Sequence, residues 1–266
     1  MEESERIDSD VKFRQADILK LEGAGNFNFG LIINADCDLA HEKNDGVIAY
    51  LPIYSFSEYI EKFWIPEEIK SITNKCKKSL EKVAGKDEEF HDLINWLRSS
   101  DWTEVSQEII DHHKIKKGEQ ENIRYCIRKL WICIHRSGTD ALKNLYNLEK
   151  DPLKHAKAQL KNAKSGLGDA HFMLSSIAGQ AGIGYIIRLR RIYSIEESCC
   201  FRSKKEYLLS STSSPIKAYR TARLTPTYKY KAAQMLAHQL SRIGLDDSLT
   251  QLNELAVDDL AQELID

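Results

Sequence analysis

The sequence lacks any long apolar segment. None of its stretches reaches the roughly 18 apolar residues that a membrane-spanning helix requires, so no such helix is expected. The N-terminal residues Met1-Glu-Glu-Ser-Glu5 are acidic, whereas a secretory signal peptide begins with basic residues. These two absences predict a cytoplasmic protein with no membrane association.

The sequence also lacks a Cys-x-x-Cys pair. Its six cysteines are Cys37, Cys76, Cys126, Cys133, Cys199 and Cys200. In a chain of 266 residues, this scatter is typical of reduced cytosolic thiols and not of a disulfide framework. A net charge of −2 argues against a protein dedicated to coating nucleic acid. We expect no cofactor.

The N-terminal part has the pattern of β-strands, after ten polar residues that we expect to be frayed. Candidate strands cover residues 11–13, 17–21, 29–33 and 46–53. Turn residues separate them, and Asn44-Asp-Gly46 favours a tight reversal. We therefore predict a small antiparallel meander, which needs further strands or covering helices to be stable.

From residue 57 to residue 164 the apolar period becomes helical. We expect helices over residues 67–83, 87–97, 103–112, 120–135 and 140–148, and Asp151-Pro152 opens one more. One stripe that we expect to be buried consists of Ile123, Ile127, Leu130, Trp131 and Ile134.

The β pattern returns in the last third of the chain. Strands are expected over residues 171–177, 185–193 and 218–224, with a Gly-rich hairpin turn at 178–184. A closing helix should run from Thr227 to Ile243 and stop at Gly244.

Two β regions around a helical middle predict an α+β fold. Its small antiparallel sheet or barrel would combine N-terminal and C-terminal segments around a large helical insertion. The expected parts are a discontinuous β-rich domain (11–56 plus 168–245), the insertion (57–167) and a C-terminal tail (246–266). The alternative is an N-terminal barrel followed by a separate α+β domain.

A polar cluster, Asn34-Ala-Asp-Cys-Asp-Leu-Ala-His41, follows the buried strand at residues 29–33. Strand ends often display binding groups. Cys37 could be a nucleophile with His41 as its base, or the two could ligate a metal with help from a carboxylate. If catalysis occurs in this chain, the candidate residues are Asp36, Asp38 and His41.

The same cluster has a structural interpretation. Asp36 or Asp38 would cap a turn or short helix, Asn34 would bond the backbone, and Cys37 would be buried. On this interpretation the protein is not an enzyme. The sequence alone leaves both interpretations open, although it favours the structural one.

Lysines form a stripe on the helix that opens at Pro152. The stripe consists of Lys150, Lys154, Lys157, Lys161 and Lys164. Beside it, Leu153, Ala156, Leu160 and Ala163 form an apolar seam with small residues that would permit close helix packing. The lysines are either a solvated face or a site for phosphate or an acidic partner. The arginines 188, 190, 191, 220 and 223 could extend the same surface.

The C-terminal tail, residues 246–266, is acidic and contains no Lys or Arg. Its apolar positions repeat at helical spacing, and those expected to dock a partner are Leu249, Leu252, Leu260 and Leu264. The alternative is that the tail folds back on its own chain, against the lysine stripe.

Four segments resemble a family of bacterial proteins with "QGDI", "QxCDL" or "DCDLA", "LxxP" and "RxGL" motifs. The matching residues are Arg14-Gln-Ala-Asp-Ile-Leu19, Gly30 to His41, Ala222-Arg-Leu-Thr-Pro226 and Leu240-Ser-Arg-Ile-Gly-Leu245, with Ala16 in place of Gly. Members of this family are accessory components of multi-gene bacterial conflict (anti-phage) systems. The resemblance implies an accessory component of such a system. Because the sequence offers no convincing catalytic constellation and has helical segments of opposite charge, we expect a non-enzymatic component that docks an operon-encoded protein partner.

Residues 14–53 are also similar to PemK/MazF-like toxin barrels, which cleave RNA. The likeness consists of the order "GDI", a strand, a polar break and a strand that contains Pro52; Phe29-Gly30 stands where those proteins have Arg-Pro. This second resemblance implies the alternative function of a nucleic-acid-binding protein or ribonuclease.

Overall fold

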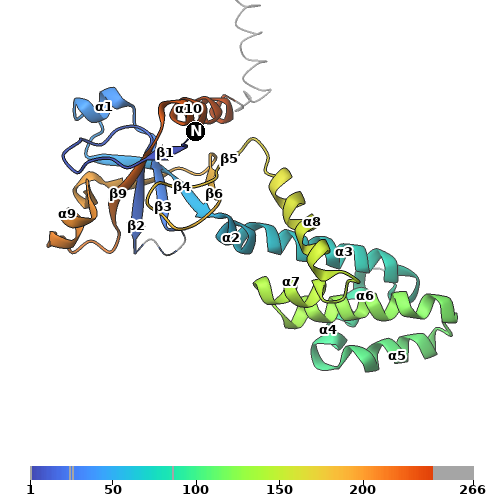
Figure 1. Ribbon diagram of the computed structural model, residues 1–266. Helices are drawn as coiled ribbons and strands as arrows, with labels where there is room; N and C mark the ends of the chain where they lie inside the picture. Colours follow the sequence, from blue (N-terminus) through green and yellow to red (C-terminus); the bar gives the residue numbers. More distant parts are fainter. Residues whose placement is uncertain (1, 24, 26, 86, 242–266) are drawn as a thin grey trace, which may run out of the picture. The chain divides into compact units, whose positions relative to one another are not determined.

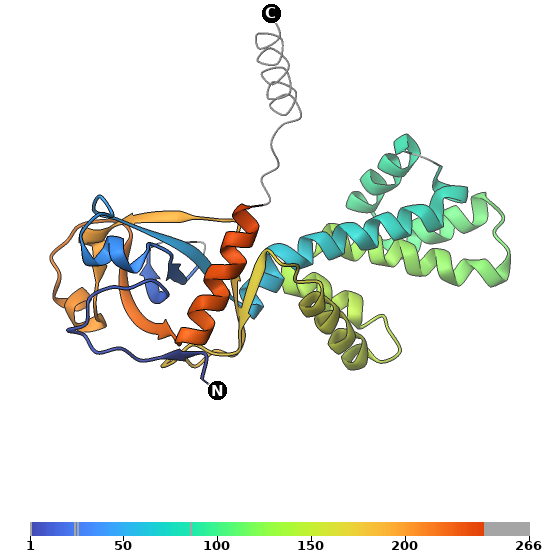
Figure 2. The same ribbon diagram turned by 90° about the horizontal axis from the view of Figure 1, so that it is seen from above.

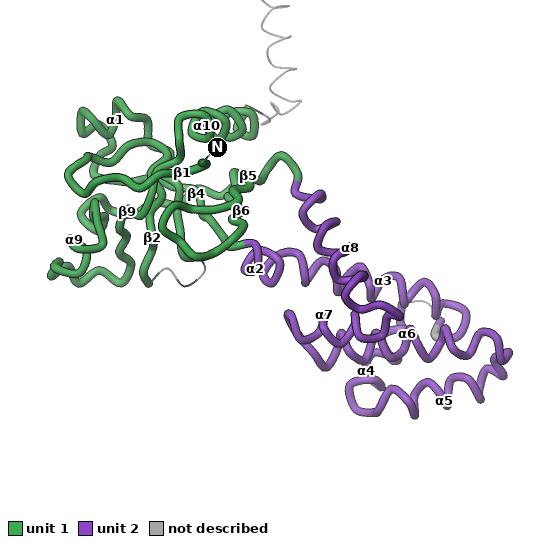
Figure 3. The backbone as a smooth tube through the Cα atoms, in the orientation of Figure 1, with its two compact units in different colours: residues 1–55, 168–266 green, residues 56–167 purple. Residues whose placement is uncertain are grey.

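The structure is a computed structural model that describes the chain except residues 1, 24, 26, 86 and 242–266 (Figure 1). The chain separates into two compact units, residues 1–55 with 168–266 (unit 1) and residues 56–167 (unit 2) (Figure 3). Unit 1 contains the strands and unit 2 is helical, which confirms the predicted α+β class. No described helix is long and apolar enough to cross a membrane.

One sheet of the half-barrel type forms the basis of unit 1. Its strand order is β1-β9-β2-β3-β4-β6-β5, and in addition β7 pairs with β4 and β8 with β9. The strands are β1 (Ser4–Glu5), β2 (Asp17–Glu22), β3 (Phe29–Ile32), β4 (Val47–Ser55), β5 (His171–Leu174), β6 (Tyr185–Arg188), β7 (Tyr193–Glu196), β8 (Cys200–Phe201) and β9 (Lys217–Leu224). All of these pairs are antiparallel except β8 with β9. N-terminal and C-terminal strands therefore share one sheet.

The described residues of unit 1 also form three α-helices, α1 (Asp36–Ala40), α9 (Lys204–Leu209) and α10 (Pro226–Leu240), and a 3-10 turn, η2 (Glu197–Cys199). The long helix α10 lies across the sheet (Figure 2). Alternate strand residues, such as Leu31 and Ile187, face Ala232 and its neighbours on α10 in one buried core. Because strand side chains alternate between faces, the remaining residues point to the other side of the sheet.

On that other side, Gly30 permits a close approach of an aromatic side chain. A Cβ atom at Gly30 would lie 2.6 Å from Cδ2 of Tyr50. The Tyr50 ring belongs to an aromatic group with Phe27 and Tyr193, at centroid distances of 6.2 and 6.0 Å. Tyr50 is buried, so it has little room to move aside.

We expect Gly30→Ala to lower the free energy of unfolding by about 1–3 kcal/mol, because an added methyl group overpacks a filled site. Urea denaturation measures this loss. Gly118→Ala is the matched control, since Gly118 lies in α6 with open space around the position of a Cβ atom. The control should be neutral or slightly stabilising, because alanine favours a helix. An equal change in the free energy of unfolding of the two variants would contradict the close packing of Tyr50 on Gly30.

Unit 2 consists of helices joined by short turns. They are α2 (Phe56–Tyr59), the π-helical turn η1 (Ile60–Trp64), α3 (Ile65–Ala84), α4 (Asp87–Ser99), α5 (Trp102–His112), α6 (Lys117–His135), α7 (Gly138–Tyr146) and α8 (Pro152–Ser165). The predicted helices of this region are confirmed, with ends that differ by a few residues. Asp101 and Asp151 cap α5 and α8, where each carboxylate accepts a backbone N–H. The predicted stripe on α6 lies in the core, with Ile123, Ile127 and Leu130 buried and Trp131 and Ile134 half-buried.

Several local predictions for unit 1 are wrong. Residues 11–13 form no strand, and the N-terminal segment expected to be frayed contains β1, which pairs with β9. The expected strand 185–193 divides into β6 and β7, which pair with different parts of β4. Helix α10 ends at Leu240, and Gly244 lies outside the described residues. Local propensity does not determine pairing between distant segments, which explains the errors at β1, β6 and β7.

Candidate functional site

The polar cluster begins where β3 ends, and its first residue has a structural role. The Asn34 side chain donates to the carbonyl of Val47 (3.1 Å) and accepts the N–H of Ala49 (2.7 Å). It thus continues the pairing of β3 with β4 after the strand ends. The expectation that Asn34 bonds the backbone is confirmed.

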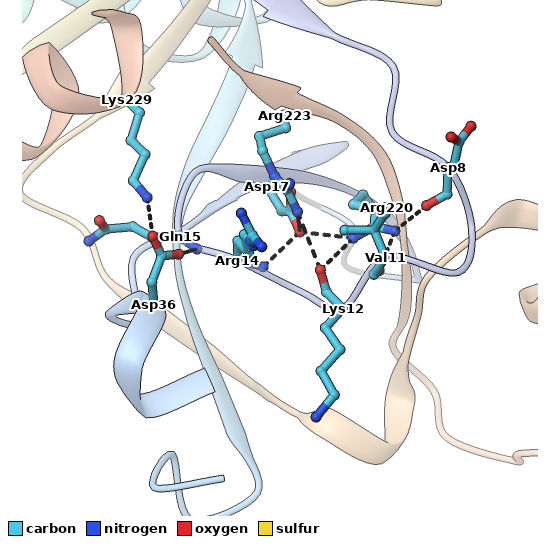
Figure 4. Close-up of polar contacts among 10 residues, drawn as sticks. All are labelled: Asp8, Val11, Lys12, Arg14, Gln15, Asp17, Asp36, Arg220, Arg223 and Lys229. Atoms are coloured by element: carbon cyan, nitrogen blue, oxygen red, sulfur yellow. Dashed lines mark hydrogen bonds and ion pairs between the residues drawn. The ribbon is translucent and has the colours of Figure 1, made fainter. Parts of the chain in front are cut away.

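Asp36, the first residue of α1, connects three segments of unit 1. Its carboxylate accepts the backbone N–H of Gln15 (2.8 Å) and pairs with the ammonium of Lys229 on α10 (Figure 4). Burial opposes ionisation of Asp36, but the hydrogen bonds from Lys229 and Gln15 outweigh it and hold the pKa of this carboxyl below its ordinary value. The residue N-terminal to α1 is Ala35, and no side chain caps the helix. The expected capping role is therefore wrong for both aspartates.

Cys37 and His41 are both exposed, so the expectation of a buried Cys37 is wrong. The Cys37 thiol lies 3.5 Å from Oδ1 of Asp38, and within the described residues no hydrogen bond joins it to His41. Over the same residues, no group of three or more His, Cys, Asp or Glu side chains could hold a metal ion. Within the described residues, Cys37 and His41 therefore form no hydrogen-bonded nucleophile–base pair, and no third residue completes a metal site with them.

A second polar centre, which the sequence did not indicate, lies at the start of β2. Asp17 is fully buried, and its carboxylate binds two arginines of β9 (Figure 4). Arg220 Nη1 lies 3.2 Å from Asp17 Oδ2, and Arg223 places Nε 2.5 Å from Oδ1 and Nη2 3.1 Å from Oδ2. The Arg14 N–H donates to the same carboxylate (2.9 Å). Bound in this way, the buried charge is paired and its lone pairs are used.

Arg220 also holds the N-terminal segment against the sheet. Its guanidinium donates to the carbonyls of Asp8 (2.8 Å), Val11 (2.7 Å) and Lys12 (3.0 Å). It further lies 5.6 Å from the ring centroid of Phe13. These bonds satisfy backbone carbonyl groups of a segment that belongs to no strand.

The proposal that Arg220 extends a basic surface is therefore wrong, since only 1% of its side chain is exposed. β9 alternates in burial, and Arg220 lies in phase with Ala218, Ala222 and Leu224, all of which are buried. This phase is visible in the sequence and could have indicated a buried arginine. The partner, Asp17, could not be named from the pattern because it is about 200 residues away in the chain.

All five lysines of the predicted stripe are exposed, and four of them lie on α8. The apolar seam beside them does not pack as expected. Ala163 is buried, but Leu153 and Leu160 are 64% and 37% exposed. The face that packs inward instead carries His155, Gln159 and Ala163, which are spaced by one turn and are half-buried or buried. The apolar pattern was misleading because this inward face carries two polar residues and one alanine, whereas the two leucines lie on the exposed side.

The lysine stripe belongs to unit 2, whereas the five arginines that could have extended it belong to unit 1.

The acidic tail, with Leu249, Leu252, Leu260 and Leu264, lies outside the described residues. No protein family, curated protein or solved structure matches the chain. The fold and the polar centre define an α+β protein with a half-barrel sheet, held together by a buried Asp–Arg network, and a helical unit inserted between its strands.

Proposed function

We propose that this chain is a non-enzymatic protein-interaction component, and that α8 binds an acidic amphipathic segment of a partner protein. The exposure of Leu153 and Leu160 among exposed lysines on α8 carries the proposal. The family resemblance adds the context of an operon-encoded partner in a bacterial defence complex. In that context, residues 246–266 are a further docking element.

The spacing on α8 supports a single interaction face. Leu153, Lys157, Leu160 and Lys164 follow one another at three or four residues and therefore lie along one side of the helix. Large apolar side chains within a charged rim are typical of helix-in-groove contacts and of binding hot spots. Because the rim is cationic, the complementary partner surface has apolar anchors flanked by carboxylates.

The polar cluster supports the non-enzymatic part of the proposal. Asn34 and Asp36, its best-placed polar groups, are used in contacts that hold β3, β4 and α10 together. A carboxylate that already binds Lys229 and a backbone N–H has less capacity to act as a general base.

The test uses the purified full chain and the purified product of the adjacent gene. We expect Leu153→Ser with Leu160→Ser to weaken binding at least about 30-fold, equivalent to the roughly 2 kcal/mol of a hot spot. Lys157→Glu with Lys164→Glu should weaken it as well, because like charges would then face each other. The matched control is Lys70→Glu with Lys78→Glu, the same charge change at exposed positions of α3. Binding that is equally strong in all variants would contradict the assigned face.

The alternative, a PemK/MazF-like nucleic-acid-binding protein or ribonuclease, rests on the same exposed lysines. Fluorescence anisotropy with RNA and DNA at low salt distinguishes the two functions, because phosphate binding weakens steeply with salt and requires the lysines. Nucleic-acid binding that is lost in the lysine variant but kept in the leucine variant would replace our proposal with this alternative.

A further inference from the structure

Two buried cysteines face each other across the α3–α6 contact of unit 2. Cys76 on α3 and Cys126 on α6 are 3% and 6% exposed, and their thiols share a hydrogen bond. Both line a cavity of about 250 Å³ that is also bordered by α7 and α8. Hydrogen peroxide is far smaller than this cavity and can fit inside it next to the two cysteines.

The surroundings of the pair make the two thiols unequal. The hydrogen bond from Cys76 lowers the pKa of the Cys126 thiol to about 7 against the effect of burial, and the Ser79 hydroxyl and the Lys129 ammonium contribute. The same hydrogen bond, together with burial, raises the pKa of Cys76. Lys129 is fixed beside the pair by Glu149, 3.3 Å away. A thiol with a lowered pKa next to a second thiol is the arrangement of a reactive cysteine with its resolving cysteine.

The cavity has a polar group that can receive a small molecule. Tyr146 lines it, and its buried hydroxyl has no hydrogen-bond partner among the described residues. A buried hydroxyl without a partner is unfavourable unless a water or another small polar molecule bonds to it. Peroxide oxygens can both donate and accept such a bond.

We propose that Cys76 and Cys126 are a peroxide-reactive dithiol pair that closes to a reversible disulfide between α3 and α6. The Cys126 thiolate attacks one oxygen of hydrogen peroxide, the O–O bond breaks, and the departing hydroxide takes up a proton to become water. Cys126 is thereby oxidised to a sulfenic acid. Cys76 then loses its proton and attacks the Cys126 sulfur, which forms the S–S bond, breaks the S–O bond and releases a second water. In sum, two thiols and one peroxide give one disulfide and two waters.

The other cysteines lack this arrangement. Burial raises the pKa of the half-buried Cys133 to about 11, so that this thiol stays protonated at neutral pH. Cys199 and Cys200 are adjacent in the chain, and the side chains of neighbouring residues diverge. Cys37 is exposed on unit 1, and we replace it in the test to prevent disulfides between molecules.

The test oxidises the reduced full chain carrying Cys37→Ser with an equimolar amount of hydrogen peroxide at neutral pH. Free thiols are then blocked with N-ethylmaleimide, and the digested protein is mapped by mass spectrometry. We expect one dominant cross-linked peptide that joins residues 76 and 126 and disappears on treatment with dithiothreitol. A disulfide of either residue with Cys133, or both thiols recovered in the blocked form, would overturn the proposal.

Single variants in the same background test the two roles. In Cys76→Ser, the sulfenic acid of Cys126 should persist and be labelled by dimedone. In Cys126→Ser, Cys76 should remain reduced. Cys199→Ser, a buried cysteine of unit 1, is the matched control and should leave the cross-link unchanged. Labelling of Cys76 in Cys126→Ser would overturn the assigned roles. The cross-link in the parent chain decides the pairing even if a variant fails to fold.

Discussion

Replacement of Asp17 by alanine is expected to lower the free energy of unfolding of unit 1 by about 3–5 kcal/mol, which is the typical effect of leaving a buried charge without its partner. Asp17 is completely buried, and 1% of the Arg220 side chain is exposed, so water cannot replace the lost carboxylate. Arg220 would keep its three backbone carbonyls, but its charge would be uncompensated. Urea denaturation followed by circular dichroism measures the loss of free energy of unfolding.

Asp36→Ala is the matched control for this prediction. Asp36 is also ion-paired with a cation, Lys229, but 46% of its side chain is exposed. An exposed ion pair contributes about 1 kcal/mol or less, so the control should change stability much less than Asp17→Ala. Similar losses in the two variants would show that burial of the Asp17 network is not the cause.

A double-mutant cycle separates the ion pair from the rest of the network. Arg220→Met alone removes the charge but leaves the carbonyls of Asp8, Val11 and Lys12 without their donor. The double variant, with Asp17→Ala, should lose less stability than the sum of the two single variants, because the buried Arg220 charge is then no longer present without Asp17; Arg223 loses the carboxylate in both variants that lack Asp17. Additive losses would mean that Asp17 and Arg220 do not depend on each other.

Leu130→Ala in unit 2 should lower the free energy of unfolding by about 2–5 kcal/mol, because it removes buried methyl groups and leaves a cavity. Leu130 is fully buried between α6 and its neighbours α3, α4 and α5. Unit 2 contains the larger part of the helices, so the loss should be seen in the far-UV circular dichroism transition.

Leu153→Ala, the same substitution at an exposed position of α8, is the control for Leu130→Ala. It should change stability by no more than about 0.5 kcal/mol, since little apolar surface is lost from the interior. A loss at Leu153 as large as that at Leu130 would contradict both the fold of α8 and the interaction face assigned to it. The two substitutions thus test whether Leu130 on α6 is buried and Leu153 on α8 is exposed.

The helical period was sufficient to predict the core face of α6. Ile123, Ile127 and Leu130 recur at one side of the helix, and burial of that side follows from amphipathicity. The same reasoning failed for α8, where Leu153 and Leu160 have helical spacing but remain exposed. A period shows which residues share a face, but whether another element covers that face depends on tertiary packing.

The polar residues show a similar limit. Asn34 and Asp36 were recognised because they stand close together at a strand end, and proximity in the chain is directly visible. The Asp17–Arg220 pair was missed because its two members belong to β2 and β9, which come together only in the sheet. A change of register between Ile18 and Leu19 further complicates the pairing of these strands.

The sequence by itself determined the absence of a long apolar segment, the α+β class and the position of most helices, because these follow from local composition and from period. The tertiary structure alone decided which charged groups are paired with each other in the interior. Asp17 and Arg220 are paired inside the sheet, while Lys154 and Lys157 remain on the surface, although all four are charged residues in regular elements. The physical reason is that burial of a charge requires an opposite charge and hydrogen-bond partners, and here those come from segments far apart in the chain.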